Sequence, residues 1–386
     1  MAKLEMETRR KVIEKQRSKY RKASKKEKGV ILDSVCIATG LSRDRVKKLF
    51  AMKERPLPSG KSRSGRHPKY GRETRLALES IWALMDFAGG KRLCAGMDDM
   101  LNALVRYGEC SFSEKTQDLL REISPATADR ILKKEKAHMR FKGISTTKPG
   151  TLLKRDIPIR LGTQWDEDMA GFLEIDLVAH CGATTAGEYI NTLDMTDIKT
   201  GWTETTAVIN KAQIHVFDAL KSIRNALPFD MLGIDSDNGS EFINDELYRY
   251  CKQENIAFTR SRPYMKNDSC HVEQKNWHVI RRNIGYGRYE GNQAVRIMND
   301  YYSLLRLYTN FFMPHMKLIS KDRNGAHITK QYEVPLSPYR RLLEDKTISA
   351  ETKEQLTKIY LSLNPITIKH DMMNLLKVLF KMAIPS

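Results

Sequence analysis

The sequence predicts a multi-domain protein in which α-helical helix-turn-helix modules precede an α/β core, followed by a small C-terminal β/α region. Three observations predict this architecture. Positive charge is concentrated at the N-terminus, helical periodicity gives way to short apolar runs after Pro149, and carboxylates stand beside predicted strands. A chain of 386 residues with 41% hydrophobic content is long enough for two or three domains and a packed core.

The charge distribution separates the N-terminus from the rest. Residues 1–72 hold 23 Lys and Arg against 7 Asp and Glu, whereas residues 73–386 hold 43 against 40. Such a basic block serves nucleic acid, an anionic membrane or solubility. No run of 18 apolar residues could span a bilayer, and the first residues lack the apolar stretch of a secretory signal. We therefore expect a nucleic-acid partner and no membrane.

The six cysteines show no CxxC pair and no Cys/His spacing typical of zinc. They are Cys36, Cys94, Cys110, Cys181, Cys251 and Cys270. We interpret them as reduced thiols of a cytoplasmic protein. The alternative is a thiol nucleophile at Cys181, beside His180, or at Cys270, before His271, but neither has a recognisable orienting partner.

The first module, residues 1–52, holds two short apolar-periodic segments separated by a turn at Gly40, with Ser42 placed to cap the second. This pattern is typical of a helix-turn-helix. The second helix carries four cations that can meet phosphates or base edges from the major groove. They are Arg43, Arg45, Lys47 and Lys48. The alternative is a helical hairpin with a solvated basic face.

Residues 53–72 have the proline and glycine content of a linker. Residues 73–150 then form a second helical module, in which Ser124 fits an N-cap and Pro125 the first helical position. We interpret this module as a second DNA-binding element. It is less basic than the first, so a packing domain is the alternative.

The core, residues 165–290, follows as short apolar runs. Strands are predicted at residues 171–178, 189–194, 203–208, 231–234 and 257–259, with helices at 211–226 and 241–254. The order βββαβαβα is that of the ribonuclease H-like fold.

Three carboxylates are placed on this core. Asp176 lies inside the first strand among apolar neighbours, where a buried charge needs a partner. Asp237 follows the fourth strand in an Asn-Gly turn, and Glu273 lies on a later helix. The first and fourth strands are neighbours in this fold, so the carboxylates can converge. Asp235 competes with Asp237, and the Asn-Gly turn favours Asp237. The alternative is that each acid is an ordinary cap or surface residue.

Converging carboxylates repel one another and demand cations, and hard oxygen ligands suit Mg²⁺ or Mn²⁺. Two such ions, roughly 3.5–4 Å apart, would activate the attacking oxygen and stabilise the leaving one in phosphodiester displacement. The acidic residues therefore point to metal-dependent chemistry on a nucleic-acid backbone.

Residues 171–287 resemble the DDE transposases and retroviral-type integrases. The resemblance rests on the run DNGSEF from Asp237, on Pro263-Tyr264, and on the 35 residues between Asp237 and Glu273. It is strongest to bacterial insertion-sequence transposases with N-terminal helix-turn-helix domains. It implies that Asp176, Asp237 and Glu273 are the catalytic metal ligands for two Mg²⁺ or Mn²⁺ ions. Unlike retroviral integrases, the chain has no His/Cys zinc module before the core.

The resemblance also implies supporting roles. Asn238 and Asn276 would support the metal ligands or contact DNA, since Asn276 lies one helical turn beyond Glu273. Three cations could hold the DNA strand, with a solvated basic face as the alternative for each. They are Lys275, Arg281 and Arg282.

The C-terminal region, residues 291–386, shows a basic hairpin pattern over residues 316–333, around Asn324-Gly325, and helices at 350–363 and 371–383. The hairpin could bind DNA or form an oligomerisation surface.

The resemblance thus implies a DNA transposase that binds the terminal repeats of a mobile element, nicks their ends by hydrolysis and joins the 3′-hydroxyl ends to target DNA. Its partners would be double-stranded DNA and other copies of itself, in a bacterial-type cytoplasm at the nucleoid. The alternatives are a ribonuclease H-like nuclease that only cleaves and a domesticated DNA-binding regulator.

Overall fold

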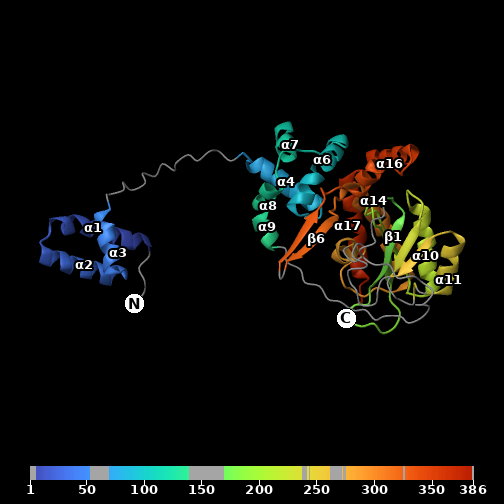
Figure 1. Ribbon diagram of the computed structural model, residues 1–386, viewed down its shortest axis with the longest axis horizontal. Coiled ribbons are helices and arrows are strands. Elements are labelled where there is room, and N and C mark those ends of the chain that lie inside the picture. The colour runs from blue at the N-terminus through green and yellow to red at the C-terminus, as the bar shows by residue number, and fades with distance from the viewer. Residues whose placement is uncertain are drawn as a thin grey trace. The chain divides into compact units, whose positions relative to one another are not determined.

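The computed structural model describes residues 6–52, 69–138, 169–236, 241–242, 244–260, 272, 275–324 and 327–384. The chain forms two compact units, Met1–Lys69 and Tyr70–Ser386 (Figure 1). The predicted fold class is confirmed, since helices precede a mixed five-stranded sheet and a hairpin with helices follows it. Within the described ranges, no helix is both long and apolar enough to cross a membrane.

The first unit contains three helices rather than two. They are α1 (Met6–Lys22), α2 (Lys25–Thr39) and α3 (Arg43–Ala51). Helix α2 begins at a capping box of Ser24 and Glu27 and ends at Gly40, whose φ of 66° suits glycine. Ser42 precedes α3 as predicted, but its side chain makes no capping bond. The helix α1 escaped the sequence analysis because its apolar stripe is sparse, with Ile13 as its buried aliphatic residue.

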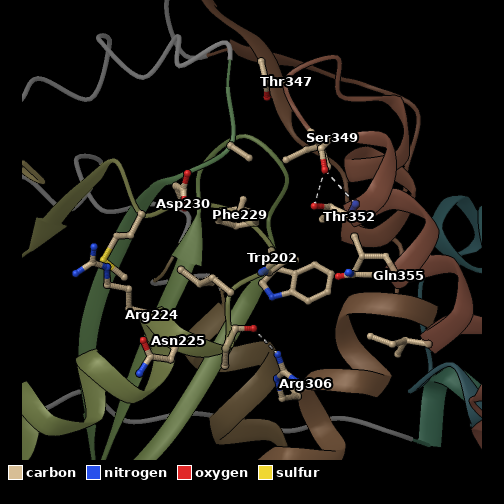
Figure 2. Close-up of a pocket in the computed structure, with 18 of the residues that line it drawn as sticks. Trp202, Arg224, Asn225, Phe229, Asp230, Arg306, Thr347, Ser349, Thr352 and Gln355 are labelled. Atoms are coloured by element: carbon tan, nitrogen blue, oxygen red, sulfur yellow. Dashed lines mark hydrogen bonds between the residues drawn. The ribbon is translucent and has the colours of Figure 1, made fainter. Parts of the chain in front are cut away.

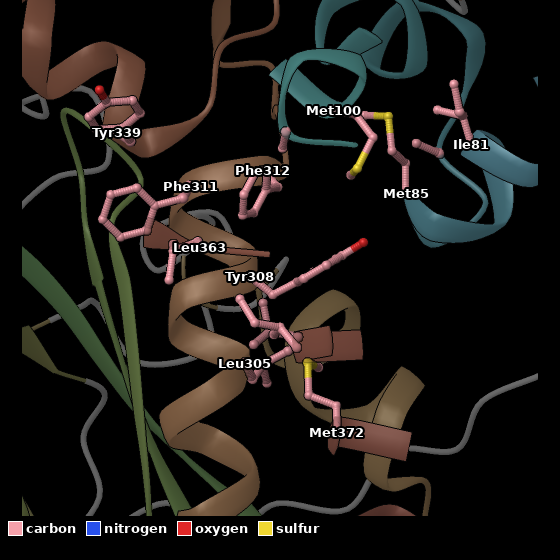
Figure 3. Packing of buried hydrophobic residues seen from close by; sticks show 14 of the residues in the cluster. Ile81, Met85, Met100, Leu305, Tyr308, Phe311, Phe312, Tyr339, Leu363 and Met372 are labelled. Atoms are coloured by element: carbon pink, nitrogen blue, oxygen red, sulfur yellow. The ribbon is translucent and has the colours of Figure 1, made fainter. Parts of the chain in front are cut away.

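Six short helices open the second unit. They are α4 (Arg72–Leu84), α5 (Gly90–Ala95), α6 (Met97–Arg106), α7 (Glu114–Arg121), α8 (Pro125–Ile131) and α9 (Lys133–His138). The predicted cap at Ser124 is confirmed, since its side chain accepts from the Thr127 N–H. These helices share one hydrophobic core with the C-terminal helices, where Met85 and Met100 pack in the same cluster as Tyr308 (Figure 3).

The predicted strand order is confirmed. The strands are β1 (Phe172–Ala179), β2 (Asn191–Asp197), β3 (Thr203–Val208), β4 (Gly233–Ser236) and β5 (Ala257–Arg260). Their spatial order is β3-β2-β1-β4-β5, with β1, β2 and β3 antiparallel and β4 and β5 parallel to β1. This is the ribonuclease H-like arrangement. The helices between the later strands are α10 (Gln213–Ala226) and α11 (Asp245–Gln253).

The two faces of this sheet differ in chemistry because side chains alternate along a strand. On β1, Leu173 and Ile175 join the apolar core formed with α10 and α11. Glu174 and Asp176 therefore point to the opposite face. On β2, Leu193 and Met195 join the same apolar core, which places Asp194 on the face of Asp176. One face of the sheet is apolar, and the other holds carboxylates.

The remaining elements lie C-terminal to the sheet. They are a π-helical stretch η1 (Asn276–Arg281), α13 (Arg282–Ile284), α14 (Gly291–Phe312), β6 (Leu318–Asn324), β7 (His327–Tyr332), α15 (Pro338–Glu344), α16 (Ala350–Ser362) and α17 (Pro365–Lys381). The predicted basic hairpin is confirmed as the antiparallel pair β6 and β7. The helix α14 had no counterpart in the sequence analysis.

Helix α14 covers part of the polar face and also supports the edge strand β3. The Asn310 side chain accepts from the Thr203 N–H at 2.9 Å and donates to the Thr203 carbonyl at 2.9 Å. The Asn299 side chain likewise accepts from the Ala207 N–H at 2.7 Å and donates to the Ala207 carbonyl at 3.1 Å. Two amide side chains thus take the place of a neighbouring strand.

Candidate active site

Asp176 is held in place by two N–H donors on the polar face of the sheet. Its Oδ1 accepts from the Leu177 N–H at 2.8 Å, and its Oδ2 accepts from Asn276 Nδ2 at 2.5 Å. The side chain is only partly buried, so the carboxylate remains reachable from outside the sheet. The structure therefore brings together Asp176 and Asn276, both of which were predicted as site residues.

Asn276 lies at the first residue of the π-helical stretch Asn276–Arg281. Such stretches are rare and occur frequently at functional sites. The Asn276 amide donates to Asp176, and its buried Oδ1 has no hydrogen-bond partner within the described residues. A buried oxygen without a donor is costly, and a bound cation or water would satisfy it.

A second carboxylate, Asp194, faces Asp176 across the β1–β2 pair. The two residues are direct register partners. Asp194 is fully buried, and its Oδ2 has no hydrogen-bond partner in the described part of the chain. Burial raises the pKa of Asp194 well above its usual value, the Lys275 ammonium opposes that rise, and the Asp176 charge adds to it. The sequence analysis missed Asp194, although it lies on the polar face of a predicted strand.

Lys275 lies between this acidic face and a group of cations. Its Nζ donates to the Gly201 carbonyl at 3.1 Å. Burial lowers the pKa of Lys275 to about 7, the Asp194 charge opposes that fall, and the charges of Arg92 and Arg341 add to it. The charge of Lys275 is thus favoured by Asp194 and opposed by burial and by the two arginines.

Two further carboxylates on the polar face have structural partners. Glu174 is fully buried, and its Oε2 accepts from the Val272 N–H at 2.7 Å. Its register partner on β4 is Asp235, whose Oδ1 accepts a hydrogen bond from the Thr259 hydroxyl on β5. Asp235, which competed with Asp237 in the sequence, therefore contributes to the sheet itself.

The remaining predicted ligands, Asp237 and Glu273, lie outside the described residues, as does Asn238. Within the residues described, no group of three His, Cys, Asp or Glu side chains is arranged to hold a metal ion. The side-chain atoms of Asp176, Asp194 and Asn276 that could bind a metal ion are all oxygens. Oxygen ligands are those that Mg²⁺ and Mn²⁺ prefer, so this half of the site fits a hard divalent cation.

The predicted cations have different surroundings. Arg281 donates from Nη2 to the Ala179 carbonyl at 2.7 Å and so ties η1 to the end of β1. Arg282 is exposed and lines a pocket with Lys275. In the first unit, Arg43 pairs with Asp33. The other three predicted cations of α3, Arg45, Lys47 and Lys48, are exposed, while Val46 and Phe50 of that helix are buried.

The thiol-nucleophile alternative has no support from the geometry at Cys181. The neighbouring His180 ring is fully buried, and its Nε2 lies 2.8 Å from the Thr192 hydroxyl. Burial, with a smaller contribution from Arg281, lowers the pKa of His180 to about 3. A histidine with this partner and this pKa is not a base for the adjacent thiol. Cys270 and His271 lie outside the described residues.

A large cavity, of about 970 Å³, lies away from Asp176, among α10, α14 and the residues around α16 (Figure 2). Its two arginines are already neutralised. Arg224 pairs with Glu254 at 2.9 Å, and Arg306 binds Glu204 through two nitrogens at 2.6 and 2.7 Å. Since both cations are paired and Asp176, the predicted catalytic residue that the structure describes, does not line this cavity, we do not take it as the candidate site.

No protein-family model matches the chain. The chain is 35% identical over 338 residues to the uncharacterised protein y4rM of Sinorhizobium fredii, covering 88% of this chain and 96% of that protein. Among solved structures, it is similar to the HTLV-2 integrase catalytic core domain in complex with magnesium, with 18% identity and a TM-score of 0.24 over 29% of this chain and 68% of that one. It is also similar to the BIV integrase catalytic core domain, with 17% identity and a TM-score of 0.29 over 46% and 95% of the two chains. The strand order and directions described above define the fold independently of these similarities.

Proposed function

We propose that this chain, which belongs to the same family as the uncharacterised protein y4rM of Sinorhizobium fredii, is a DNA transposase. It would bind the terminal repeats of a mobile element, cleave their ends and join them to target DNA. The observation that carries the proposal is the contact between Asp176 and Asn276 on the carboxylate face of a ribonuclease H-like sheet. Asp176 occupies the first-strand position that the DDE resemblance assigns to a catalytic carboxylate.

In this proposal, Asp176, Asp237 and Glu273 would hold two Mg²⁺ or Mn²⁺ ions. When bound, such ions supply the positive charge that activates an entering oxygen and stabilises a leaving one. Asn276 orients Asp176 through its amide, and Asn238 is proposed to support Asp237 in the same manner. Mutation of groups that orient metal ligands commonly lowers activity or metal affinity by about 10- to 100-fold.

The first unit supports a DNA partner through the exposed cations of α3. We propose that it reads double-stranded DNA at the element ends, while the second unit carries the chemistry. The protein would act as a homo-oligomer on DNA, at the nucleoid in a bacterial-type cytoplasm.

The test is strand transfer with a pre-cleaved DNA end in Mg²⁺, beside a mobility-shift assay of DNA binding. Asp176→Asn, Asp237→Asn and Glu273→Gln should each lower cleavage and joining together, by at least about 10- to 100-fold, while DNA binding survives. Asp235→Asn is the matched control, since its carboxylate bonds to Thr259, and it should keep much of its activity. Chelation should abolish activity, Mg²⁺ or Mn²⁺ should restore it, and Ca²⁺ should restore it poorly.

Four outcomes contradict parts of the proposal. Near wild-type joining by Glu273→Gln, or an inactive Asp235→Asn beside an active Asp237→Asn, overturns the site assignment. Cleavage without joining would identify a nuclease. Sequence-specific binding without any cleavage would identify a DNA-binding regulator.

A further inference from the structure

A basic pocket of about 350 Å³ lies next to the residues that hold Asp176. Segments far apart in the sequence build it, among them α5 with the residues before it, the stretch from Lys275 to Asn283, α14, and the residues that precede β6. Four basic side chains line it. They are Arg92, Lys275, Arg282 and Lys317. The pocket therefore joins the helical region, the core and the hairpin.

Three of these side chains donate to backbone carbonyls, Lys275 to that of Gly201, and Arg282 lies over the Phe87 ring. Arg92 donates to the Pro314 carbonyl at 2.5 Å, and Lys317 donates to the Lys199 carbonyl at 3.0 Å. Within the described part of the chain, none of the four forms an ion pair within 4.0 Å. The lining includes Asp86, but that carboxylate is already paired with Lys369. Apart from Asp86, the described residues that line the pocket include no carboxylate, and the nearby charges of Asp194 on Lys275 and of Glu333 on Lys317 act from outside the lining.

The charges perturb one another, which shows that they share one partly desolvated space. Burial and then the charge of Arg282 lower the pKa of Arg92. Burial, followed by Arg92, Arg282 and Lys275, lowers the pKa of His278 to about 4, so this ring is neutral at pH 7. Like charges held together in partial burial are costly, and an anion in the pocket would relieve that cost. The cavity of about 970 Å³ offers no such opportunity, because both of its arginines are paired.

The size of the pocket limits the anion. Its volume equals that of about ten water molecules, which is room for a phosphate group and part of the attached sugars but not for a folded partner. Arginine and lysine are the usual ligands of phosphate oxygens in protein–DNA complexes.

We propose that the pocket lined by Arg92, Lys275, Arg282 and Lys317 binds one backbone phosphate of the DNA strand that lies at the active site. The inference rests on the proposed function, since it takes DNA as the ligand. The pocket lies beside the active site because Lys275, which lines it, immediately precedes Asn276, the residue that binds Asp176. Two of its four cations, Arg92 and Lys317, lie outside the sheet and its helices, so the helical region and the hairpin would help to place DNA against the core.

The test uses the full chain and a duplex that the protein itself selects from a randomised library. Binding affinity is measured against salt for wild type, for the double variant R282Q/K317Q, and for K377Q, an exposed lysine on α17 outside the pocket, as the matched control. We expect the double variant to lose about tenfold in affinity and to lower the salt slope by about one, as for one lost phosphate contact. K377Q should match wild type.

Methylphosphonate substitution identifies the phosphate directly, because it removes the charge from one chosen position. Wild type should lose about tenfold in affinity when one particular phosphate is neutralised, and the double variant should lose almost nothing more at that position. Thermal unfolding followed by circular dichroism checks that the variants are folded. Arg282 is exposed, so R282Q alone provides the same test if the double variant does not fold.

An unchanged affinity and salt slope in the folded variant would overturn the proposal. The proposal would also be overturned if the variant bound DNA more weakly but its loss of affinity added to that of phosphate neutralisation at every position. Full additivity would indicate that the cations attract DNA through a general electrostatic field and not through one bound phosphate. Failure to join DNA ends, with the predicted interference still present, would refute the transposase assignment and leave the phosphate pocket standing. The two proposals therefore fail in different assays.

Discussion

Replacing Asn276 by leucine tests the contact that orients Asp176. Leucine keeps the approximate shape of asparagine but removes the amide that donates to Asp176 Oδ2 at 2.5 Å. Asp176 would keep its bond from the Leu177 N–H and lose the donor that fixes its second oxygen. We expect the carboxylate to rotate more freely, so that the catalytic geometry is populated less often.

The magnitude follows from the strength of that bond. A hydrogen bond to a charged group contributes about 1.5–3 kcal/mol, which corresponds to about 10- to 150-fold in rate if the whole term is lost from the transition state. Asp176 is only partly buried, so water can replace part of the lost bond. We therefore expect a fall of about tenfold in joining, with DNA affinity unchanged.

The assay is the rate of joining of a pre-cleaved end at saturating DNA, repeated over a range of Mg²⁺ concentrations. Asn276→Leu should need more Mg²⁺ for half-maximal rate, and Asn276→Gln should recover part of the loss. The matched control is Asn225→Leu, at an exposed position beside the cavity of about 970 Å³. Joining within twofold of wild type at every Mg²⁺ concentration would refute the orienting role, as would a loss of DNA binding that accounts for the whole effect.

Three further predictions concern stability and DNA binding. Because the pKa of buried His180 in the folded protein, about 3, lies below the ordinary value of about 6.5, the unfolded state binds a proton first as pH falls. The free energy of unfolding should therefore carry no penalty from His180 above pH 6.5 and should fall by about 2 kcal/mol at pH 5. Urea unfolding of wild type and His180→Gln at both pH values measures this difference. An equal pH dependence in the two proteins would contradict the prediction. Phe312→Ala, in the core shared by α14 and the helical region, should lower the free energy of unfolding by about 3–5 kcal/mol, and a loss below 1 kcal/mol in denaturant titration would show that the site collapses without cost. Changing Arg45, Lys47 and Lys48 together to glutamine should reduce the salt dependence of DNA binding by up to about three phosphate contacts, whereas an unchanged slope in fluorescence anisotropy would remove α3 from the DNA interface.

The core of the fold was predictable because its signals are local. The apolar run of β1, the β-branched residues of β3 and the apolar stripe of α10 are each readable within a few residues, and they predict the order of strands and helices along the chain. Asp176 stood out for the same reason, as a carboxylate among apolar strand residues. The end of a strand is less local, and β2 extends to Asp197 rather than stopping at Asp194.

The features that escaped prediction depend on distant partners. Asp194 becomes part of the site only through its register with Asp176, which a strand pattern alone does not specify. The basic pocket joins Arg92 to Lys317, more than two hundred residues apart in the sequence. Helix α14 was detectable in principle, since its buried residues recur at helical spacing. They include Ala294, Met298, Tyr301, Leu305, Tyr308 and Phe312. Its start, however, lacks a side-chain cap, so the usual signal for a helix beginning is missing.

The two asparagines of α14 close one route of self-association. A bare edge strand offers a row of unpaired N–H and carbonyl groups on which a strand from another copy can add. At β3, Asn310 occupies both groups of Thr203, and Asn299 occupies both groups of Ala207. A sheet that runs on from one copy into the next is therefore blocked at this edge. If copies assemble on DNA, their contacts must be made through other surfaces, and the geometry of this edge can stay the same in every copy of the assembly.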